Sequence, residues 1–465
     1  MSYALLLSAV VAVQGADTAA INRFVETELA RQRIPGLSLA VLRGDSVLLS
    51  RGYGLANVEL RVPASDSTVY QSGSMGKQFT AALVEMLVEQ GRLRLDDSIV
   101  RWFPEGANVW RGVTVRRLLT HTAGIAEYTD STFDYRKDYT EDELVKFAAS
   151  RPLDFQPGER WSYSNTGYVL LGALIRRVSG QFYGDLLRDS VFRPLGMNAS
   201  RVISEADIVP NRAAGYRLAD GELKNQEWVA PMLNTTADGA LYFTVRDLTR
   251  WAIALNHARV AGGSLLDTAW SSVRLSDGAT YPYGFGWNVL PQRTQARIAH
   301  TGSWQGFKTV IARYPARGLT VIVLANLAEA QPGAIAYGIA GLLDPQLQPP
   351  HLATAQGNVR PPAPIEQLLR NIAAKPDSAA ITPRFRRFLT KDYTDWFAAL
   401  TGETRQWTFS GCDQFPGGSR AFSYLGSSIA YTCHARSVRP SGSGTSVSVY
   451  YTRDWRAAGV EGYSF

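Results

Sequence analysis

The apolar and polar positions of the first 250 residues predict two strands followed by a largely helical region. Two apolar runs, 37–42 and 46–51, flank a glycine-containing segment at 43–45, which is typical of a tight turn between strands. Residues 74–90 carry apolar side chains at helical spacing, and Gly91 follows them as a frequent helix end. Further helical patterns occupy residues 141–149, 167–178 and 245–256.

Strand patterns return after residue 280, and a change of composition separates the last hundred residues from the rest. Apolar strand runs occupy residues 283–289, 296–300, 307–314 and 319–325. Six prolines fall within residues 344–364, which is the composition of a linker. Beyond them, two helical patterns at 365–374 and 382–401 precede strand patterns at 406–412, 421–433 and 445–453. We therefore expect a linker over 344–364 and a separate α+β domain over 365–465.

The composition is that of a folded protein rather than a disordered, collagen-like or polytopic membrane protein. The 465 residues are 45% hydrophobic and 19% charged, and no apolar run reaches the roughly 18 residues that a membrane span requires. The net charge of +7 is spread along the chain, and the densest basic segment, 384–387, lies within a helical pattern. A solvated helix face explains that segment better than a nucleic-acid site. We expect neither a nucleic-acid partner nor a transmembrane span.

The first residues have features of a secretory signal peptide. Residues 4–13 form an apolar run that is too short to cross a bilayer, and Val13 and Gly15 occupy the positions that precede a signal cleavage site. No Lys or Arg precedes the run, and the alternative is a buried first strand or helix. We predict a signal peptide over residues 1–15 and a secreted or periplasmic location.

The cysteines agree with export, and the histidines do not indicate a metal site. Cys412 and Cys433 lie close together in strand-rich sequence, and two cysteines in an exported chain favour a disulfide over free thiols. The five histidines are scattered without the spacing of metal ligands. We expect a disulfide between these two cysteines, and neither a metal nor another cofactor.

A serine and a lysine three residues apart open the helical pattern at 74–90. Residues i and i+3 share a helix face, so the hydroxyl of Ser74 and the amine of Lys77 point into one space. A serine hydroxyl is a weak nucleophile that needs a nearby base, and a desolvated lysine can serve as one. Of the seven lysines in the chain, only Lys77 has a serine three residues before it. The alternative is a serine helix cap followed by a surface lysine.

Two further motifs carry polar groups suited to substrate binding and proton transfer. In the loop segment 163–165, Tyr163 and Asn165 share one side when the backbone is extended. His300-Thr301-Gly302-Ser303 ends a strand pattern, where an edge strand can pair with an extended substrate and a glycine permits close approach. Taken singly, each motif has a structural alternative: a turn with a packed tyrosine, or a strand end with a buried histidine.

In order and spacing, the three motifs together resemble the penicillin-recognising serine hydrolase family. This family includes class C β-lactamases, related D,D-peptidases and esterases. The resemblance covers roughly residues 20–340. It is supported by the stretches at 34–36, 118–124, 155–158 and 239–244. The implied fold is α+β: an antiparallel sheet flanked by helices, with an all-helical subdomain and the active site between them. The hydrolase domain would then occupy residues 16–343.

The resemblance implies a role for each matching residue. Ser74 would be the nucleophile that becomes acylated, Lys77 its base or proton relay, and Tyr163 the partner acid and base. Asn165, His300, Thr301, Gly302 and Ser303 would bind substrate. The backbone N–H groups of Ser74 and Ser303 would form the oxyanion hole. His121 matches one of the supporting stretches, and we interpret it as structural.

His300 departs from the lysine that is usual in the third motif of true β-lactamases. A histidine has an unperturbed pKa of about 6.5 and is mostly neutral at pH 7, so we expect weaker dependence on a substrate carboxylate. This favours a D,D-peptidase, D-amino-acid peptidase or esterase that acts on small acyl compounds or peptides, such as a peptidoglycan stem peptide. Two alternatives remain open: a β-lactamase, and a non-catalytic binding protein on the same fold.

Overall fold

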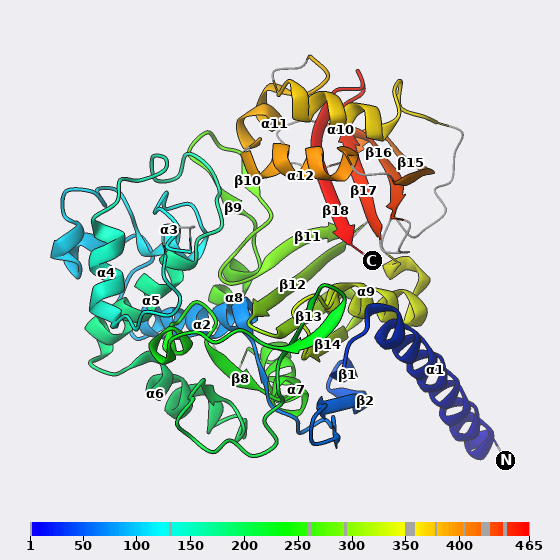
Figure 1. Ribbon diagram of the computed structural model, residues 1–465, viewed down its shortest axis with the longest axis horizontal. Helices are drawn as coiled ribbons and strands as arrows, with labels where there is room; N and C mark the ends of the chain where they lie inside the picture. Colours follow the sequence, from blue (N-terminus) through cyan, green and yellow to red (C-terminus); the bar gives the residue numbers. More distant parts are fainter. Residues whose placement is uncertain are drawn as a thin grey trace. The chain divides into compact units, whose positions relative to one another are not determined.

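The chain folds into two compact units in the computed structural model (Figure 1). The first unit comprises Met1–Asp277, Pro282–Leu290 and Ala296–Leu343, and the second comprises Gly278–Tyr281, Pro291–Gln295 and Asp344–Phe465. The structure describes residues 2–129, 133–258, 263–292, 295–348, 359–376, 379–389, 391–402, 405–419, 428–439 and 444–464.

A seven-stranded sheet in the order β11-β12-β13-β14-β1-β2-β3 forms the centre of the first unit. Its strands are β1 (Gly36–Arg43), β2 (Ser46–Asn57), β3 (Val62–Pro63), β11 (Asn288–Gln292), β12 (Gln295–Trp304), β13 (Phe307–Tyr314) and β14 (Leu319–Ala325). The neighbours β12, β13, β14, β1, β2 and β3 pair antiparallel. Every residue of β14 is buried, which explains why all but Thr320 are apolar, since a strand covered on both faces does not alternate. The α+β fold predicted from the sequence is confirmed.

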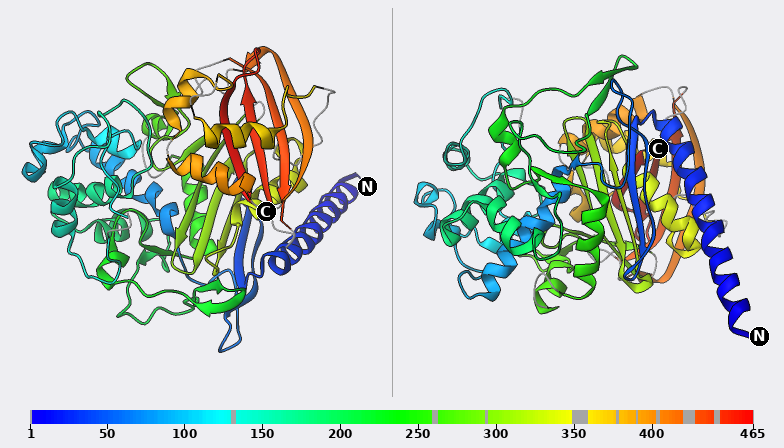
Figure 2. Two further views of the ribbon diagram at one scale, coloured as in Figure 1. Left: turned by 45° about the horizontal axis from the view of Figure 1, so that its top comes forward. Right: turned by 90° about the horizontal axis from the view of Figure 1, so that it is seen from below.

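Helices cover the sheet, as the two views in Figure 2 show. Against the sheet pack α1 (Ser2–Gln32), α7 (Val245–Asn256) and α9 (Pro332–Leu343). The predicted signal peptide falls within α1, and its removal stays a prediction. Within the described residues, the structure contains no helix that combines the length and the apolar character needed to cross a membrane.

A helical subdomain lies beside the sheet, and α2 (Lys77–Glu89) packs against two of its helices, α5 (Asn165–Ser179) and α6 (Tyr183–Leu187). The subdomain also includes α3 (Val115–Leu119) and α4 (Glu141–Ala149). Phe79 of α2 is fully buried, with its ring centroid 4.2 Å from that of Trp251 on α7 and 4.6 Å from that of Phe243. These aromatic contacts join α2 to α7, and so hold the first turn of α2 in place.

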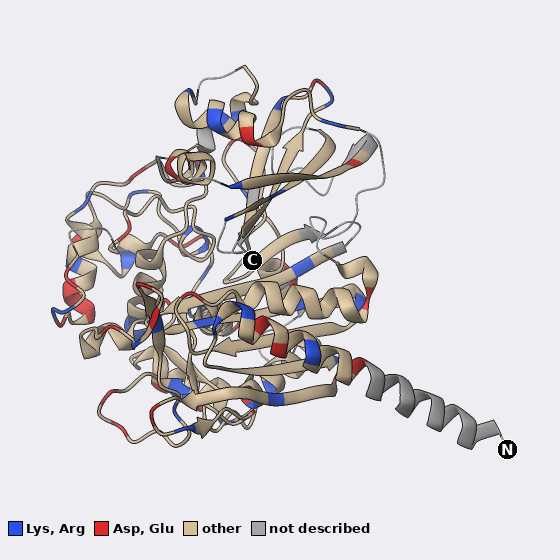
Figure 3. Ribbon diagram, turned by 45° about the vertical axis from the view of Figure 1, so that its right-hand side comes forward, with Lys and Arg blue, Asp and Glu red and all other residues tan. Residues whose placement is uncertain are grey.

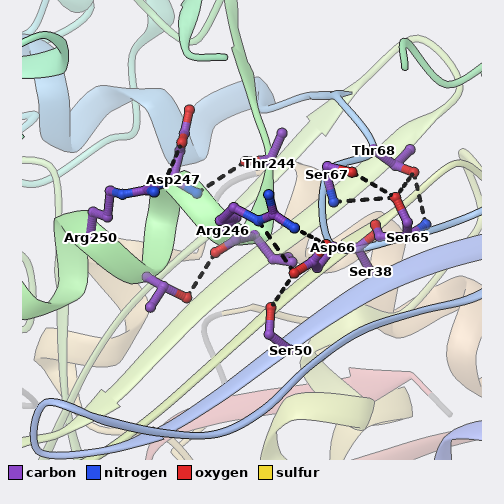
Figure 4. Close-up of polar contacts among 12 residues, drawn as sticks. Ser38, Ser50, Ser65, Asp66, Ser67, Thr68, Thr244, Arg246, Asp247 and Arg250 are labelled. Atoms are coloured by element: carbon purple, nitrogen blue, oxygen red, sulfur yellow. Dashed lines mark hydrogen bonds and ion pairs between the residues drawn. The ribbon is translucent and has the colours of Figure 1, made fainter. Parts of the chain in front are cut away.

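A polar network fixes the segment that leads to α2 (Figure 4). Asp66 accepts hydrogen bonds from Arg246 (2.8 Å) at the start of α7 and from Ser50 (3.3 Å) on β2. Thr244 caps α7 by accepting from the backbone N–H of Asp247 (3.0 Å). The chain then forms β4 (Tyr70–Gln71), which pairs with β8 (Leu241–Phe243) directly before Ser74. One end of this segment is therefore tied to β2 and α7, and the other to β8 of a separate three-stranded sheet.

The described residues of the second unit form a four-stranded antiparallel sheet and three α-helices. Its strands are β15 (Gln406–Ser419), β16 (Ile429–Val438), β17 (Gly444–Tyr451) and β18 (Ala457–Ser464), and its helices are α10 (Ile365–Ala374), α11 (Pro383–Phe388) and α12 (Lys391–Gly402). The structure has two helices where the apolar pattern predicted one over 382–401, and β18 was not predicted. Cys412 and Cys433, directly opposite each other on β15 and β16, form the expected disulfide. The predicted strand residues 421–427 lie outside the described residues.

Charged residues of both signs are interspersed along the same elements (Figure 3). Many of the described arginines pair with a nearby carboxylate, among them Arg176 with Glu141 and Arg188 with Asp185. The surface pattern thus agrees with the spread of charge in the sequence.

Candidate active site

Ser74 lies in a single 3₁₀ turn, η1 (Gly73–Gly76), directly before α2. The sequence predicted one continuous helix from residue 74, whereas the α-helix begins only at Lys77. In a 3₁₀ turn the side chains at i and i+3 eclipse, which aligns Ser74 with Lys77 more closely than an α-helix does. Ser72 holds this turn from the other side by donating its hydroxyl hydrogen bond to the carbonyl of Gly239 (2.9 Å).

Lys77 is fully buried, and its ammonium donates hydrogen bonds to three acceptors. Its Nζ lies 3.1 Å from Ser74 Oγ, 2.7 Å from Asn165 Oδ1 and 2.6 Å from the backbone carbonyl oxygen of Asp238. A lysine has three N–H donors, so this arrangement satisfies all of them. Lys77 Nζ therefore joins the first motif to the second, although Lys77 and Asn165 are 88 residues apart in the sequence.

Tyr163 lies beside this lysine, in the loop before α5. The centroid of its ring is 4.9 Å from Lys77 Nζ and 4.3 Å from the ring of His121. Its hydroxyl is buried and has no hydrogen-bond partner among the described residues. Since most buried polar atoms in proteins are paired, an unpaired hydroxyl on a ring beside Lys77 is a candidate for proton transfer, although Tyr163 is not among the residues that line the cavity at Ser74.

The first turn of α5 orients Asn165. Ser164 caps the helix by accepting from the N–H of Gly167 (3.1 Å), and its own N–H donates to Nδ1 of His121 (3.1 Å). The N–H of Asn165 donates to Glu127 Oε2 (2.5 Å). His121 is buried with a pKa well below its ordinary value because of desolvation, so its ring is neutral and packs behind Tyr163. This agrees with a structural role for His121.

Two acidic residues of the site were missed by sequence reasoning. Glu127 supports Asn165 and also accepts from the hydroxyl of Thr129 (3.1 Å), and burial raises its pKa. The backbone carbonyl oxygen of Asp238 accepts from Lys77, and its carboxylate accepts from the hydroxyl of Tyr128 (3.0 Å). The available signal was position: Glu127 follows the stretch at 118–124, and Asp238 precedes the stretch at 239–244.

His300 is buried on β12 and holds one tautomer. Its Nδ1 lies 2.6 Å from the carbonyl oxygen of Thr301, which can only accept, so Nδ1 carries the hydrogen. In the neutral ring, Nε2 then accepts from the hydroxyl of Tyr283 (2.9 Å). Burial and, to a smaller extent, the charge of Lys77 lower the pKa of His300 to about 3. The third motif therefore carries no positive charge on His300 at neutral pH.

The backbone packs so closely around Ser74 that positions 73 and 302 have no room for a side chain. A Cβ on Gly302 would lie 1.9 Å from the carbonyl oxygen of Ser72, and a Cβ on Gly73 (φ +54°) would lie 2.4 Å from the nitrogen of Ser303. Strands β12 and β13 are joined by a two-residue turn closed by Trp304 and Phe307. Hydrogen-bonded and non-hydrogen-bonded pairs alternate along such a ladder, so the N–H of Ser303 points away from β13. It is free to act with the N–H of Ser74 at the start of η1 as an oxyanion hole.

Three of the predicted residues line one small cavity of about 70 Å³: Ser74, Asn165 and Ser303. Tyr128, Asp238, Gly239 and Trp304 complete much of its wall. Thr301, also predicted to bind substrate, is exposed on the same face of β12 as Ser303. Among the described residues there is no group of His, Cys, Asp and Glu placed to hold a metal ion.

Comparison with known proteins places this site in a family. Residues 21–342 match the family model described as Beta-lactamase. Penicillin-binding protein 4* of Bacillus subtilis (strain 168) is 32% identical over 326 residues, which cover 66% of this chain and 72% of that protein. Protein flp of Staphylococcus aureus (strain MW2) is 27% identical over 314 residues, and the match spans only 62% of its length.

Solved structures show the same fold. The D-amino acid amidase from Ochrobactrum anthropi SV3 superposes with a TM-score of 0.61 at 25% identity, covering 71% of this chain and 97% of that one. The octameric penicillin-binding protein homologue from Pyrococcus abyssi has a TM-score of 0.65 at 24% identity and covers 96% of this chain and 99% of that one. The chain therefore belongs to the beta-lactamase family of penicillin-recognising serine hydrolases.

Proposed function

We propose that this protein is an exported enzyme that hydrolyses amide or ester bonds through an acyl-enzyme on Ser74. The observation that carries the proposal is the contact between Lys77 Nζ and Ser74 Oγ (3.1 Å), in a buried setting that also contains the unpaired hydroxyl of Tyr163. A nucleophile within hydrogen-bond reach of a base, itself oriented by further groups, is the arrangement that activates a serine.

The proposed reaction has two steps. In the first, Ser74 Oγ attacks the substrate carbonyl carbon while its proton passes to Lys77 in its neutral amine form or to Tyr163 in its phenolate form, and the carbonyl oxygen becomes an oxyanion held by the N–H groups of Ser74 and Ser303. The intermediate then collapses, the bond to the leaving group breaks, and Tyr163 gives that group a proton. In the second step water attacks the acyl-enzyme through the same proton transfers in reverse and releases the acid and free Ser74.

The third motif and the relatives support the choice of substrate class. Because His300 is neutral, the fixed charge that a third-motif lysine offers to a β-lactam carboxylate is missing at that position. One relative is named a penicillin-binding protein, and one structural neighbour is titled a D-amino acid amidase. We therefore favour a D,D-peptidase, D-amino-acid peptidase or esterase. Acylation by a penicillin is the second candidate, since penicillin binding is in the relative's name.

Export is part of the proposal. The disulfide between Cys412 and Cys433 persists best in an oxidising compartment, and the first 15 residues have the pattern of a signal peptide. The residues named for the candidate site all belong to the first unit.

Replacing the nucleophile should abolish covalent labelling. Wild type incubated with a fluorescent penicillin or a fluorophosphonate should gain one adduct, and peptide mapping by mass spectrometry should locate it on Ser74. Ser74→Ala should gain none, because the attacking oxygen is gone, whereas Ser150→Ala, at an exposed serine, should label as wild type does. Equal labelling of Ser74→Ala, or no labelling of wild type by either probe, would contradict the assignment.

Removing only the hydroxyl of Tyr163 should slow the chemistry without disturbing the packing. Tyr163→Phe keeps the ring against His121 and Lys77 but removes the group that transfers the proton. The value of kcat/KM for a nitrophenyl ester or a D-alanyl-D-alanine peptide should therefore fall by about 10²- to 10⁴-fold, the usual contribution of a general acid or base. Tyr139→Phe, in another loop, serves as the matched control and should change little. An unchanged rate in Tyr163→Phe would exclude the proton-transfer role.

The pKa of His300 gives a prediction about pH. Since burial lowers this pKa to about 3, the imidazole should stay neutral from pH 8 down to about pH 4, with the hydrogen on Nδ1. NMR of protein labelled in its five histidines can follow this ring, and His300→Gln assigns its signals by their loss. A protonation step of His300 between pH 5 and pH 7 would show that the ring is solvated or paired with an acid.

A further inference from the structure

Another cavity of the first unit lies apart from Ser74, beside the start of α7. Its volume is about 340 Å³, within the usual range of sites for small molecules. Its walls come from four segments of the chain, which are residues 67–69, 196–201, 209–211 and 244–250. None of the described residues that line it also lines the cavity at Ser74, so the two cavities are separate.

Three arginines line this cavity. Arg246 and Arg250 are one helical turn apart on α7, so they share a face of that helix (Figure 4). Arg201 belongs to the short strand β5 (Arg201–Val202). Each arginine pairs with an aspartate, but each uses at most two of its five N–H donors on acceptors among the described residues. The remaining donors are available to a ligand.

The one carboxylate in the lining, that of Asp247, is already bound by groups of the protein. Its side chain is only 4% exposed, and it accepts from the N–H of Ala199 (2.9 Å), the hydroxyl of Ser200 (2.9 Å) and Arg250 (3.1 Å). The cavity therefore carries more accessible positive than negative charge.

The ion pairs of the other two arginines leave both side chains accessible. Arg201 pairs with Asp207 and is 45% exposed, while Arg246 pairs with Asp66 and is 55% exposed. Exposed ion pairs contribute little to stability, so these arginines can turn toward a bound anion at small cost.

The wall between the charged groups is largely apolar. Val69, Ala199 and Val209 line the cavity and belong to one hydrophobic cluster. Asn198 is exposed at the same cavity, and its amide makes no hydrogen bond with another described residue, so it offers a further N–H donor. A ligand that matches this lining has a negatively charged group and a small apolar part.

We propose that this cavity binds a small organic anion. Its carboxylate or phosphate group would contact Arg201, Arg246 and Arg250, because the planar guanidinium matches both kinds of oxyanion with two parallel hydrogen bonds. Its apolar part would pack against Val69 and Val209. The inference goes beyond the proposed function and does not depend on it, since it involves no residue of the cavity at Ser74.

The test measures the binding of four probes to the full chain by isothermal titration calorimetry at low ionic strength. The organic anions are 4-phenylbutyrate, which carries a carboxylate, and phenyl phosphate. The controls are 4-phenylbutanamide, which lacks the charge, and inorganic phosphate, which lacks the apolar part. We expect wild type to bind at least one of the two organic anions at least about 10-fold more tightly than its control, because the control lacks either the charge-assisted contacts or the apolar ones.

Variants locate the binding. Arg250→Met should weaken binding of that organic anion by about 10- to 100-fold, the range expected for losing a charge-assisted hydrogen bond. Arg201→Met, on an exposed strand residue, should act in the same direction and serves if Arg250→Met does not fold. Arg176→Met is the matched control, because this arginine is also 42% exposed and paired with a carboxylate, that of Glu141, but does not line the cavity. It should bind as wild type does.

Three results would overturn the inference. They are no binding of either organic anion to wild type, equal binding of each organic anion and its control, and wild-type affinity in folded Arg250→Met and Arg201→Met. Tighter binding of 4-phenylbutyrate or of phenyl phosphate supports the inference in either case and shows whether the site prefers a carboxylate or a phosphate.

Discussion

The buried ammonium of Lys77 is the feature on which the site depends. Removing a charge from water costs on the order of several kcal/mol unless other groups replace its hydration. Here Ser74, Asn165 and the carbonyl of Asp238 replace it, and they belong to three segments that are far apart in the sequence. If one of these acceptors moved, a buried donor would be left unpaired. The lysine therefore binds the start of α2, the start of α5 and the segment before β8 into one constellation.

Close contacts between backbone segments also hold the site together. Gly73, Gly239 and Gly302 allow η1, the segment before β8 and β12 to meet with no side chains between them. This brings the N–H groups of Ser74 and Ser303 into one cavity wall, and packing of Phe79 against Trp251 keeps α2 from shifting. The geometry of the site follows from the packing of its scaffold, since its reactive groups sit at the ends of rigid elements.

The sequence was most informative where the chemistry is local. Ser74 and Lys77, or Tyr163 and Asn165, lie within one turn or loop, so their spacing made each pair a candidate, and the order of the three motifs together indicated the family. Long strands such as β14 could be predicted because an almost entirely apolar run indicates burial on both faces. The 3₁₀ turn at Ser74 could not, because it arises from the contacts of Gly73 with β12 and the β8 segment rather than from local propensity. Glu127 and Asp238 lie beside two of the supporting stretches, but only the fold shows that they contact Asn165 and Lys77.

The most direct test of this account is the rate at which Ser74 is acylated when Lys77 is changed. Stopped-flow or rapid-quench measurement with a fluorescent penicillin or a nitrophenyl ester should show acylation slowed by at least about 10³-fold in Lys77→Met, since groups that act as a unit lose most of their effect together. Circular dichroism should confirm that the variant is folded, and Lys224→Met should acylate as wild type does. If folded Lys77→Met were acylated at the wild-type rate, Lys77 would have no part in activating Ser74, and the central claim would be wrong.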